Sequence, residues 1–167
     1  GRYFPVPAFP AEDLEKELSG RIWTLTSDRD LVIAERSIAL CARMNVAEDG
    51  LGRVAGSILD DSVALTLRLA WFRWLQKQNP ERAVEVAVAA LKAGTFEVRL
   101  ATATYLLDRQ VKSKEVSDHV KQTLRSSKDV RELQGALGLL NKMPASEAVL
   151  RDLVIDLRDG KIAEIGE

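Results

Sequence analysis

The only histidine and the only cysteine are the first side chains to consider as catalytic groups or metal ligands. A zinc site or a serine–histidine–acid triad would need His119 together with partners brought to it in space. Val116, Val120 and Thr123 lie at helical spacing from His119, so we interpret it as a structural residue at the edge of an apolar stripe. Cys41 lies on an apolar-rich segment and is interpreted as a small core residue rather than a nucleophile.

Two further groups have the residue types of a functional site without its spacing. Asp60 and Asp61 are adjacent at a predicted helix start, where their side chains point apart and act as caps. The glycines at 50, 52 and 56 do not match a phosphate-binding loop. They either weaken the predicted helix 48–59 or let it approach a neighbour closely, and we expect it to be the most mobile element. The sequence therefore predicts no catalytic residue, no metal site and no cofactor.

The composition is that of an ordinary globular domain. The 167 residues carry 29% charged side chains and a formal net charge of -1, so the whole chain has no charge excess to attract a polyanion. Apolar runs are shorter than the ~18 residues that cross a bilayer. One cysteine and no evident targeting segment favour a cytoplasmic location.

The segment from Asp61 to Gln76, DSVALTLRLAWFRWLQ, is predicted to be the central helix. It is apolar on nearly every face, with Arg68 and Arg73 among the few interruptions. Such a helix has to lie between neighbours, because a surface helix shows only one apolar stripe. Periodicity and capping signals predict the remaining helices. They span about residues 11–25, 28–44, 48–59, 61–77, 80–93, 96–109, 114–125, 130–142 and 146–157.

The caps come from short polar residues. Ser27 or Asp28, Asn79 followed by Pro80, Thr95 and Ser113 precede four of these helices, and a further cap is placed at Asp60 or Asp61. Asp129 leads into the helix at 130–142, and Ser146 with Glu147 opens the last helix.

The longer helices begin near residues 28, 61, 96 and 129, and each is followed by a second helix. A period of about 32–35 residues is typical of stacked helical hairpins. Two copies are clear, EVRLATATYLLDRQ from Glu97 and DVRELQGALGLLNKM from Asp129, and two are looser.

The Val98-Arg99 and Val130-Arg131 pairs, each followed by alanines and a double leucine, resemble HEAT-like repeats of the kind found in bilin-lyase-type proteins. The resemblance implies an all-α fold, a right-handed α-solenoid of about four stacked antiparallel helix pairs. It also implies that the first helices form the outer face and the second helices the concave one. We expect an extended arm over residues 1–10, one repeat domain over 11–158 and a tail over 159–167. A helix ending near Arg158, with Gly160 as its C-cap, is favoured over a β-hairpin at Asp159-Gly160.

The predicted function is a non-catalytic scaffold that binds a protein or peptide in the concave groove. The groove would be lined by polar side chains whose charges alternate in sign. These are Arg53, Arg82, Glu85, Lys92, Asp118, Lys121, Gln122, Arg125 and Arg151.

Two alternatives remain open. One is nucleic-acid binding or base repair through the basic patch Arg109–Lys128, since HEAT-like DNA glycosylases use tryptophan, acidic residues and a basic cleft. Trp71 and Trp74, three residues apart, fit that reading less well than core packing. The other alternative is a bilin-lyase-like accessory protein, implied by the repeat resemblance alone.

Overall fold

The computed structural model describes residues 21–41, 48–92, 95–144 and 146–159, and within these ranges the secondary structure is helical, with no strand. The helices are α2 (Leu31–Cys41), α3 (Glu48–Leu59), α4 (Leu65–Gln78), α5 (Pro80–Ala90), α6 (Phe96–Asp108), α7 (Lys114–Ser126), α8 (Val130–Lys142) and α9 (Ser146–Arg158). The all-α prediction is confirmed, as is a helix rather than a hairpin up to Arg158. The predicted arm at 1–10, most of the helix at 11–25 and the cap at Gly160 lie outside the described residues.

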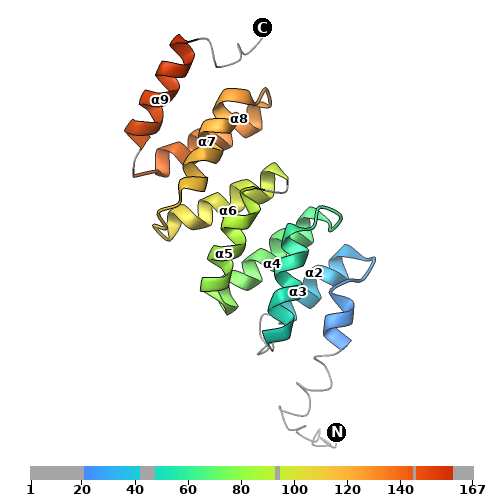
Figure 1. Ribbon diagram of the computed structural model, residues 1–167. Coiled ribbons are helices and arrows are strands. Elements are labelled where there is room, and N and C mark those ends of the chain that lie inside the picture. The colour runs from blue at the N-terminus through green and yellow to red at the C-terminus, as the bar shows by residue number, and fades with distance from the viewer. Residues whose placement is uncertain (1–20, 42–47, 93–94, 145, 160–167) are drawn as a thin grey trace, which may run out of the picture.

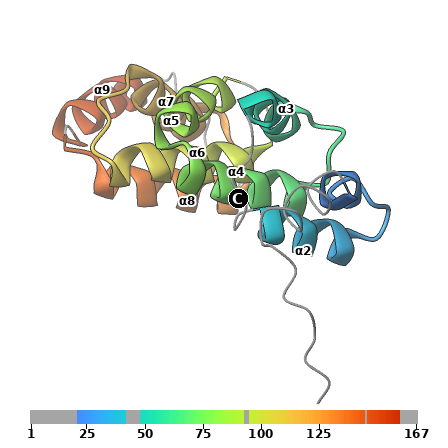
Figure 2. The ribbon, with the colours of Figure 1, turned by 90° about the horizontal axis from the view of Figure 1, so that it is seen from below.

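The helices form an open row in which α2 and α9 lie at opposite ends (Figure 1). Figure 2, which shows the row from below, reveals two layers of helices. The first layer consists of α2, α4, α6 and α8, and the second of α3, α5, α7 and α9. In the first layer each helix packs on the next along the whole row. The second layer is interrupted, because α3 packs on α5 and α7 on α9, whereas α5 and α7 are not among the closely packed pairs.

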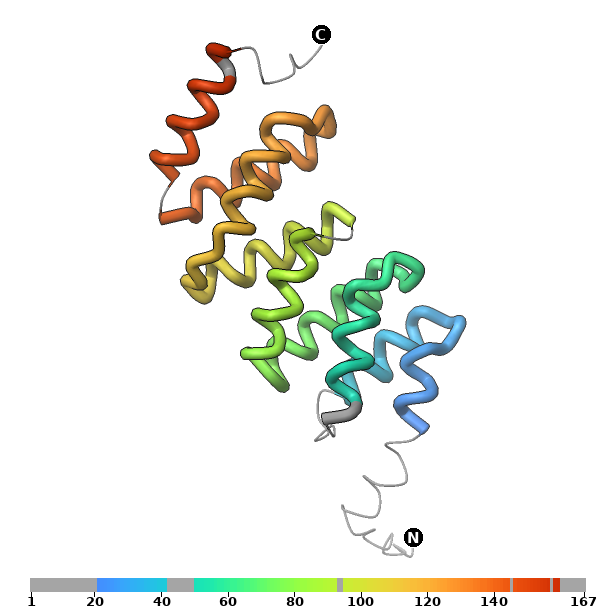
Figure 3. The backbone as a smooth tube through the Cα atoms, viewed as in Figure 1, coloured from blue at the N-terminus to red at the C-terminus, as the bar shows by residue number. Residues whose placement is uncertain are grey.

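The closest helix pairs differ from the predicted ones, although the predicted pairs α4–α5 and α8–α9 also pack on each other. The sequence paired each first-layer helix with the helix that follows it. In the structure α3 packs most closely on α4, α5 on α6 and α7 on α8, and these pairs succeed one another in the trace of Figure 3. The packing of α2 on α3 and of α6 on α7 is sparse by comparison. Periodicity marks where helices lie but not which neighbour a helix covers.

Helix α4 is the predicted central helix and lies between α2, α3, α5 and α6. Trp71, Phe72, Trp74 and Leu75 are all buried in the core. Trp71 stacks on Trp23 with 5.3 Å between ring centroids and meets Trp74 edge-on at 5.7 Å. Both tryptophans of α4 are therefore core residues.

The start of α4 corrects the sequence prediction. Its first helical residue is Leu65, and the N-cap position is Ala64, without a side-chain cap. Asp60 instead accepts a hydrogen bond from the Ser62 amide in the turn, and Asp61 pairs with Arg68 at 2.6 Å. Arg68 is only 1% exposed, and its Nε donates to the Ile58 carbonyl at the end of α3. An arginine from α4 thus satisfies one of the carbonyls that a helix end leaves open.

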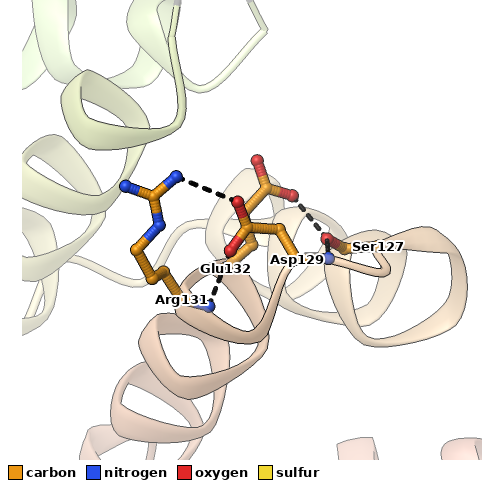
Figure 4. A network of polar contacts seen from close by, with 4 residues as sticks. All are labelled: Ser127, Asp129, Arg131 and Glu132. Atoms are coloured by element: carbon orange, nitrogen blue, oxygen red, sulfur yellow. Dashed lines mark hydrogen bonds and ion pairs between the residues drawn. The ribbon is translucent and has the colours of Figure 1, made fainter. Parts of the chain in front are cut away.

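The other caps agree in part with the prediction. Asn79 accepts from the Arg82 amide, with Pro80 opening α5. Asp129 accepts from the Arg131 amide at 2.7 Å, and its other oxygen pairs with the Arg131 guanidinium (Figure 4). Thr95 and Ser113 occupy N-cap positions without a side-chain cap hydrogen bond.

The start of α2 differs from the prediction. Its cap is Asp30, which accepts from the Val32 amide, rather than Ser27 or Asp28. The start of α9 agrees with the prediction, because Ser146 is its first helical residue.

The α6–α8 contact depends on a glycine, which leads to the first prediction. A Cβ on Gly135 would lie 2.7 Å from Phe96 Cζ and 3.3 Å from both Leu100 methyl carbons, whereas a Cβ on Gly138 would meet nothing within 4 Å. Gly138→Ala should raise the free energy of unfolding by about 0.5–1 kcal/mol, the usual gain of alanine over glycine in a helix. Gly135→Ala should lose that gain, because Phe96 and Leu100 must move. Urea titration of both variants measures the difference, and an equal gain in both would contradict the close approach.

Candidate functional site: a polar surface on helix α7

The residues predicted to bind a partner lie in or directly after second-layer helices. Arg53 is on α3, Arg82 and Glu85 are on α5, Lys92 follows α5, and Arg151 is on α9. The remaining four are on α7: Asp118, Lys121, Gln122 and Arg125. Arg82 and Glu85 pair with each other on one exposed surface of α5. The structure brings together the α7 residues and Lys92. Helices α3 and α9, which carry Arg53 and Arg151, lie towards the two ends of the row (Figure 1).

The exposed ridge of α7 separates two hollows. Asp118, Gln122 and Ser126, spaced four residues apart along one side of the helix, line both of them. The hollow towards α5 has a volume of about 440 Å³ and the one that also includes Lys121 and Arg125 about 470 Å³. We call this area the α7 surface.

The hollow towards α5 is a polar cleft at the interruption of the second layer. Lys92, which follows α5, and Arg99 of α6 line this cleft. Helix α7 contributes Glu115, His119 and Thr123. Ser127 and Glu132 close it near the start of α8, where Ser127 Oγ donates to Glu132 Oε2 at 2.6 Å (Figure 4). The cleft therefore mixes cations, carboxylates, hydroxyls and an imidazole, which suits a polar peptide better than an apolar ligand.

Arg99 is the cation of this cleft that sequence reasoning missed. It is half-buried, its Nε has no hydrogen-bond partner, and no ion pair joins it to another residue in the part of the chain that the structure describes. The sequence feature that could have drawn attention to Arg99 is the Val98-Arg99 pair, which we interpreted only as a mark of the repeat. Arg131, the corresponding residue of the Val130-Arg131 pair, instead forms an ion pair with Asp129.

His119 forms part of the cleft wall and is 8% exposed. Its Nε2 has no partner among the described residues. Burial lowers the pKa of His119, the Arg99 guanidinium lowers that pKa further, and Glu132 acts in the opposite direction. The folded protein thus favours neutral imidazole.

The lowered pKa predicts that acid destabilises the fold through His119. Between the ordinary pKa of about 6.5 and the lower folded-state value, the unfolded chain binds the proton more tightly, so stability falls as the pH falls through this window. The melting temperature of the wild type should drop between about pH 7.5 and about pH 5.5. His119→Gln should show a smaller drop, measured by circular dichroism. An identical drop in both proteins would assign the acid sensitivity to other groups.

Lys121 and Arg125, two of the predicted groove residues, form ion pairs with the last helix. Lys121 pairs with Asp152 and Arg125 with Asp156, both carboxylates on α9. The Lys121 ammonium lowers the pKa of Asp152 by hydrogen bonding and by its charge. These two bridges attach α9 to α7, so reversing the two cations would loosen the last helix as well as alter the surface.

The pairing also reduces the basic patch proposed for nucleic acid. Two of its six cations are paired with α9, and Arg109 lies over the Tyr105 ring at 5.2 Å. Lys112, Lys114 and Lys128 remain exposed.

The described residues contain neither an accessible thiol nor a cluster of potential metal ligands. Cys41 is 1% exposed, and burial raises the pKa of its thiol against a smaller backbone hydrogen-bond effect, which favours the unreactive thiol. The described residues contain no group of three or more potential metal-binding side chains.

Comparison with known proteins gives no relative: no family model, no curated protein and no solved structure matches the chain. Among the described helices, none combines the length and the apolar character needed to span a bilayer.

Proposed function

We propose that the chain is a right-handed, HEAT-like α-solenoid that acts as a non-catalytic scaffold for a protein partner. The proposal rests on the open, two-layered row of helices, in which successive helices bury their apolar sides on each other. In such a stack the second layer, α3, α5, α7 and α9, is the concave side, and the partner would bind there.

The observation that carries the assignment is the α7 surface. Its ridge exposes Asp118, which forms no ion pair with another described residue, and the Gln122 amide, and both side chains line the two hollows. A polar peptide can hydrogen-bond to these groups without displacing a contact that holds the fold together. Mixed charges select a partner by complementarity rather than by overall attraction.

The test replaces the ridge and leaves the α7–α9 bridges in place. Tagged wild type, Asp118→Lys/Gln122→Lys and the control Arg36→Glu, an exposed residue on first-layer helix α2, are used for affinity capture followed by cross-linking mass spectrometry. We expect one protein to be captured by the wild type and the control, to cross-link to α7, and to be lost with the ridge variant. Equal capture by all three proteins would overturn the assignment of the surface.

Nucleic-acid binding is the competing hypothesis and makes an opposite prediction. Contacts of Lys112, Lys114 and Lys128 with phosphates would give an affinity that falls steeply with salt. We expect no shift of duplex or single-stranded DNA in a gel at low salt. A salt-sensitive shift that disappears with Lys112→Glu/Lys114→Glu would favour that hypothesis over the protein scaffold.

A further inference from the structure

A second groove lies between α2 and α4, two helices of the first layer (Figure 2). Its volume is about 390 Å³. Its lining is apolar at the base and charged at the rim. The base consists of Ile38, Ala39, Ala70 and Trp74, and the rim of Glu35, Arg73 and Lys77.

The groove exists because small side chains lie where two packed helices meet. Ala39 of α2 and Ala70 of α4 leave room above the contact, while Ile38 and Trp74, each 2% exposed, belong to the core. Filling the groove therefore needs no rearrangement of core side chains. It would cover alanine methyl groups that solvent now reaches.

Trp74 adds an unsatisfied polar group to the groove wall. Its indole Nε1 donor is buried and has no acceptor among the described residues. Buried donors in folded proteins nearly always have a partner. Because the Nε1 atom itself is inaccessible, an occupant of the groove would contact the ring of Trp74 rather than this donor.

The cations at the rim distinguish this groove from a similar groove between α6 and α8. The counterpart, lined by Leu100, Gly135 and Leu139, has Lys142 at its rim, and Lys142 pairs with Asp108 at 3.0 Å. Arg73 and Lys77 lie one helical turn apart on α4 and are exposed, yet neither forms an ion pair within the described ranges. The Nε of Arg73 donates only to the Leu69 carbonyl of its own helix, at 3.2 Å.

We propose that the α2–α4 groove is a docking site for an acidic, amphipathic peptide segment of a partner protein. A leucine-sized side chain of the segment enters over Ala39 and Ala70, and a neighbouring carboxylate pairs with Arg73 and Lys77. Glu35 on the opposite rim repels a second carboxylate and so sets the direction of the segment. This site is independent of the α7 surface, and its test can fail without affecting that proposal.

The experiment measures the binding of a defined probe to the whole chain. The probe is an eight-residue peptide of alternating glutamate and leucine, labelled with fluorescein, and binding is followed by fluorescence anisotropy. We expect saturable binding at or below about 1 mM, the range of weak peptide docking. Arg73→Glu/Lys77→Glu should weaken it at least about tenfold, a loss of about 1.4 kcal/mol. Ala39→Trp, which fills the groove from an exposed position, should weaken it similarly.

Matched controls identify the chemistry and the place. Arg82→Glu, an exposed charge reversal on second-layer helix α5, should bind the probe as the wild type does. Peptides with lysine in place of glutamate, or alanine in place of leucine, should not bind. The proposal is overturned if the wild type does not bind the probe, if Arg73→Glu/Lys77→Glu and Ala39→Trp bind it normally, or if the lysine peptide binds equally well. Displacement of the probe by dodecanoate at a lower concentration than unlabelled peptide would overturn it in favour of a fatty-acid site.

Discussion

Arg68→Ala should lower the free energy of unfolding by about 3–5 kcal/mol, which for a chain of this length is about 10 °C in melting temperature. The side chain is fully buried, so its removal leaves a cavity between α3 and α4. It also leaves the Ile58 carbonyl without its 2.9 Å donor. The Asp61 carboxylate remains in water, because that residue is 63% exposed, and adds little to the cost.

A second substitution separates packing from hydrogen bonding at this position. Arg68→Met keeps most of the side-chain volume and abolishes the hydrogen bond, so we expect a cost of about 1–3 kcal/mol. The matched control is Arg73→Ala, five residues on in α4 and exposed, which should change stability by less than about 0.5 kcal/mol. Urea denaturation followed by circular dichroism measures all three. If Arg68→Ala were as mild as Arg73→Ala, the buried arginine would not hold the end of α3.

Trp71→Ala should destabilise the chain by about 3–5 kcal/mol, comparable with the largest effects of aromatic deletion. Trp71 is 4% exposed and contacts both other tryptophans, stacking on Trp23 at an interplanar angle of 15° and meeting Trp74 at 90°. Its loss removes apolar burial and two aromatic pairs at once.

Trp23→Ala is the comparison for this prediction. Trp23 is half-buried near the α2 end of the row and makes the same stacking contact from the other side. Its removal should cost clearly less, because the vacated space opens towards solvent. Equal losses in chemical denaturation would mean that the stacked pair, and not the burial of Trp71, carries the energy.

The helices were predictable because their signals are local. The apolar pattern of α4, Asn79 with Pro80, and the Asp129 cap each depend on residues within a turn or two of one another. The start of α4 was wrong for the same reason, since a carboxylate before an apolar run fits a cap equally well. Nothing in the sequence marks Asp61 as the partner of a buried arginine seven residues later.

The candidate site was predictable only in outline. The second-layer residues of α7 do lie on one surface, because helical spacing determines which side chains share a face. The bridges from Lys121 and Arg125 to α9 join residues that are 31 apart in the chain. The cleft lined by Arg99 and His119 lies where α5 and α7 do not pack closely on each other. Both depend on how the layers assemble, which periodicity does not encode.

The interruption between α5 and α7 also bears on how the molecule bends. At that point the row is joined mainly through α6 and α8, so we expect the assembly to bend more readily there than between α4 and α5. Bending at this joint would widen or narrow the polar cleft. The contacts among Trp23, Trp71 and Trp74 would stay intact, because they lie on one side of the joint. A ligand bound between α5 and α7 would therefore restrict this bending. It would reduce the flexibility of the whole row although it contacts only a small part of it.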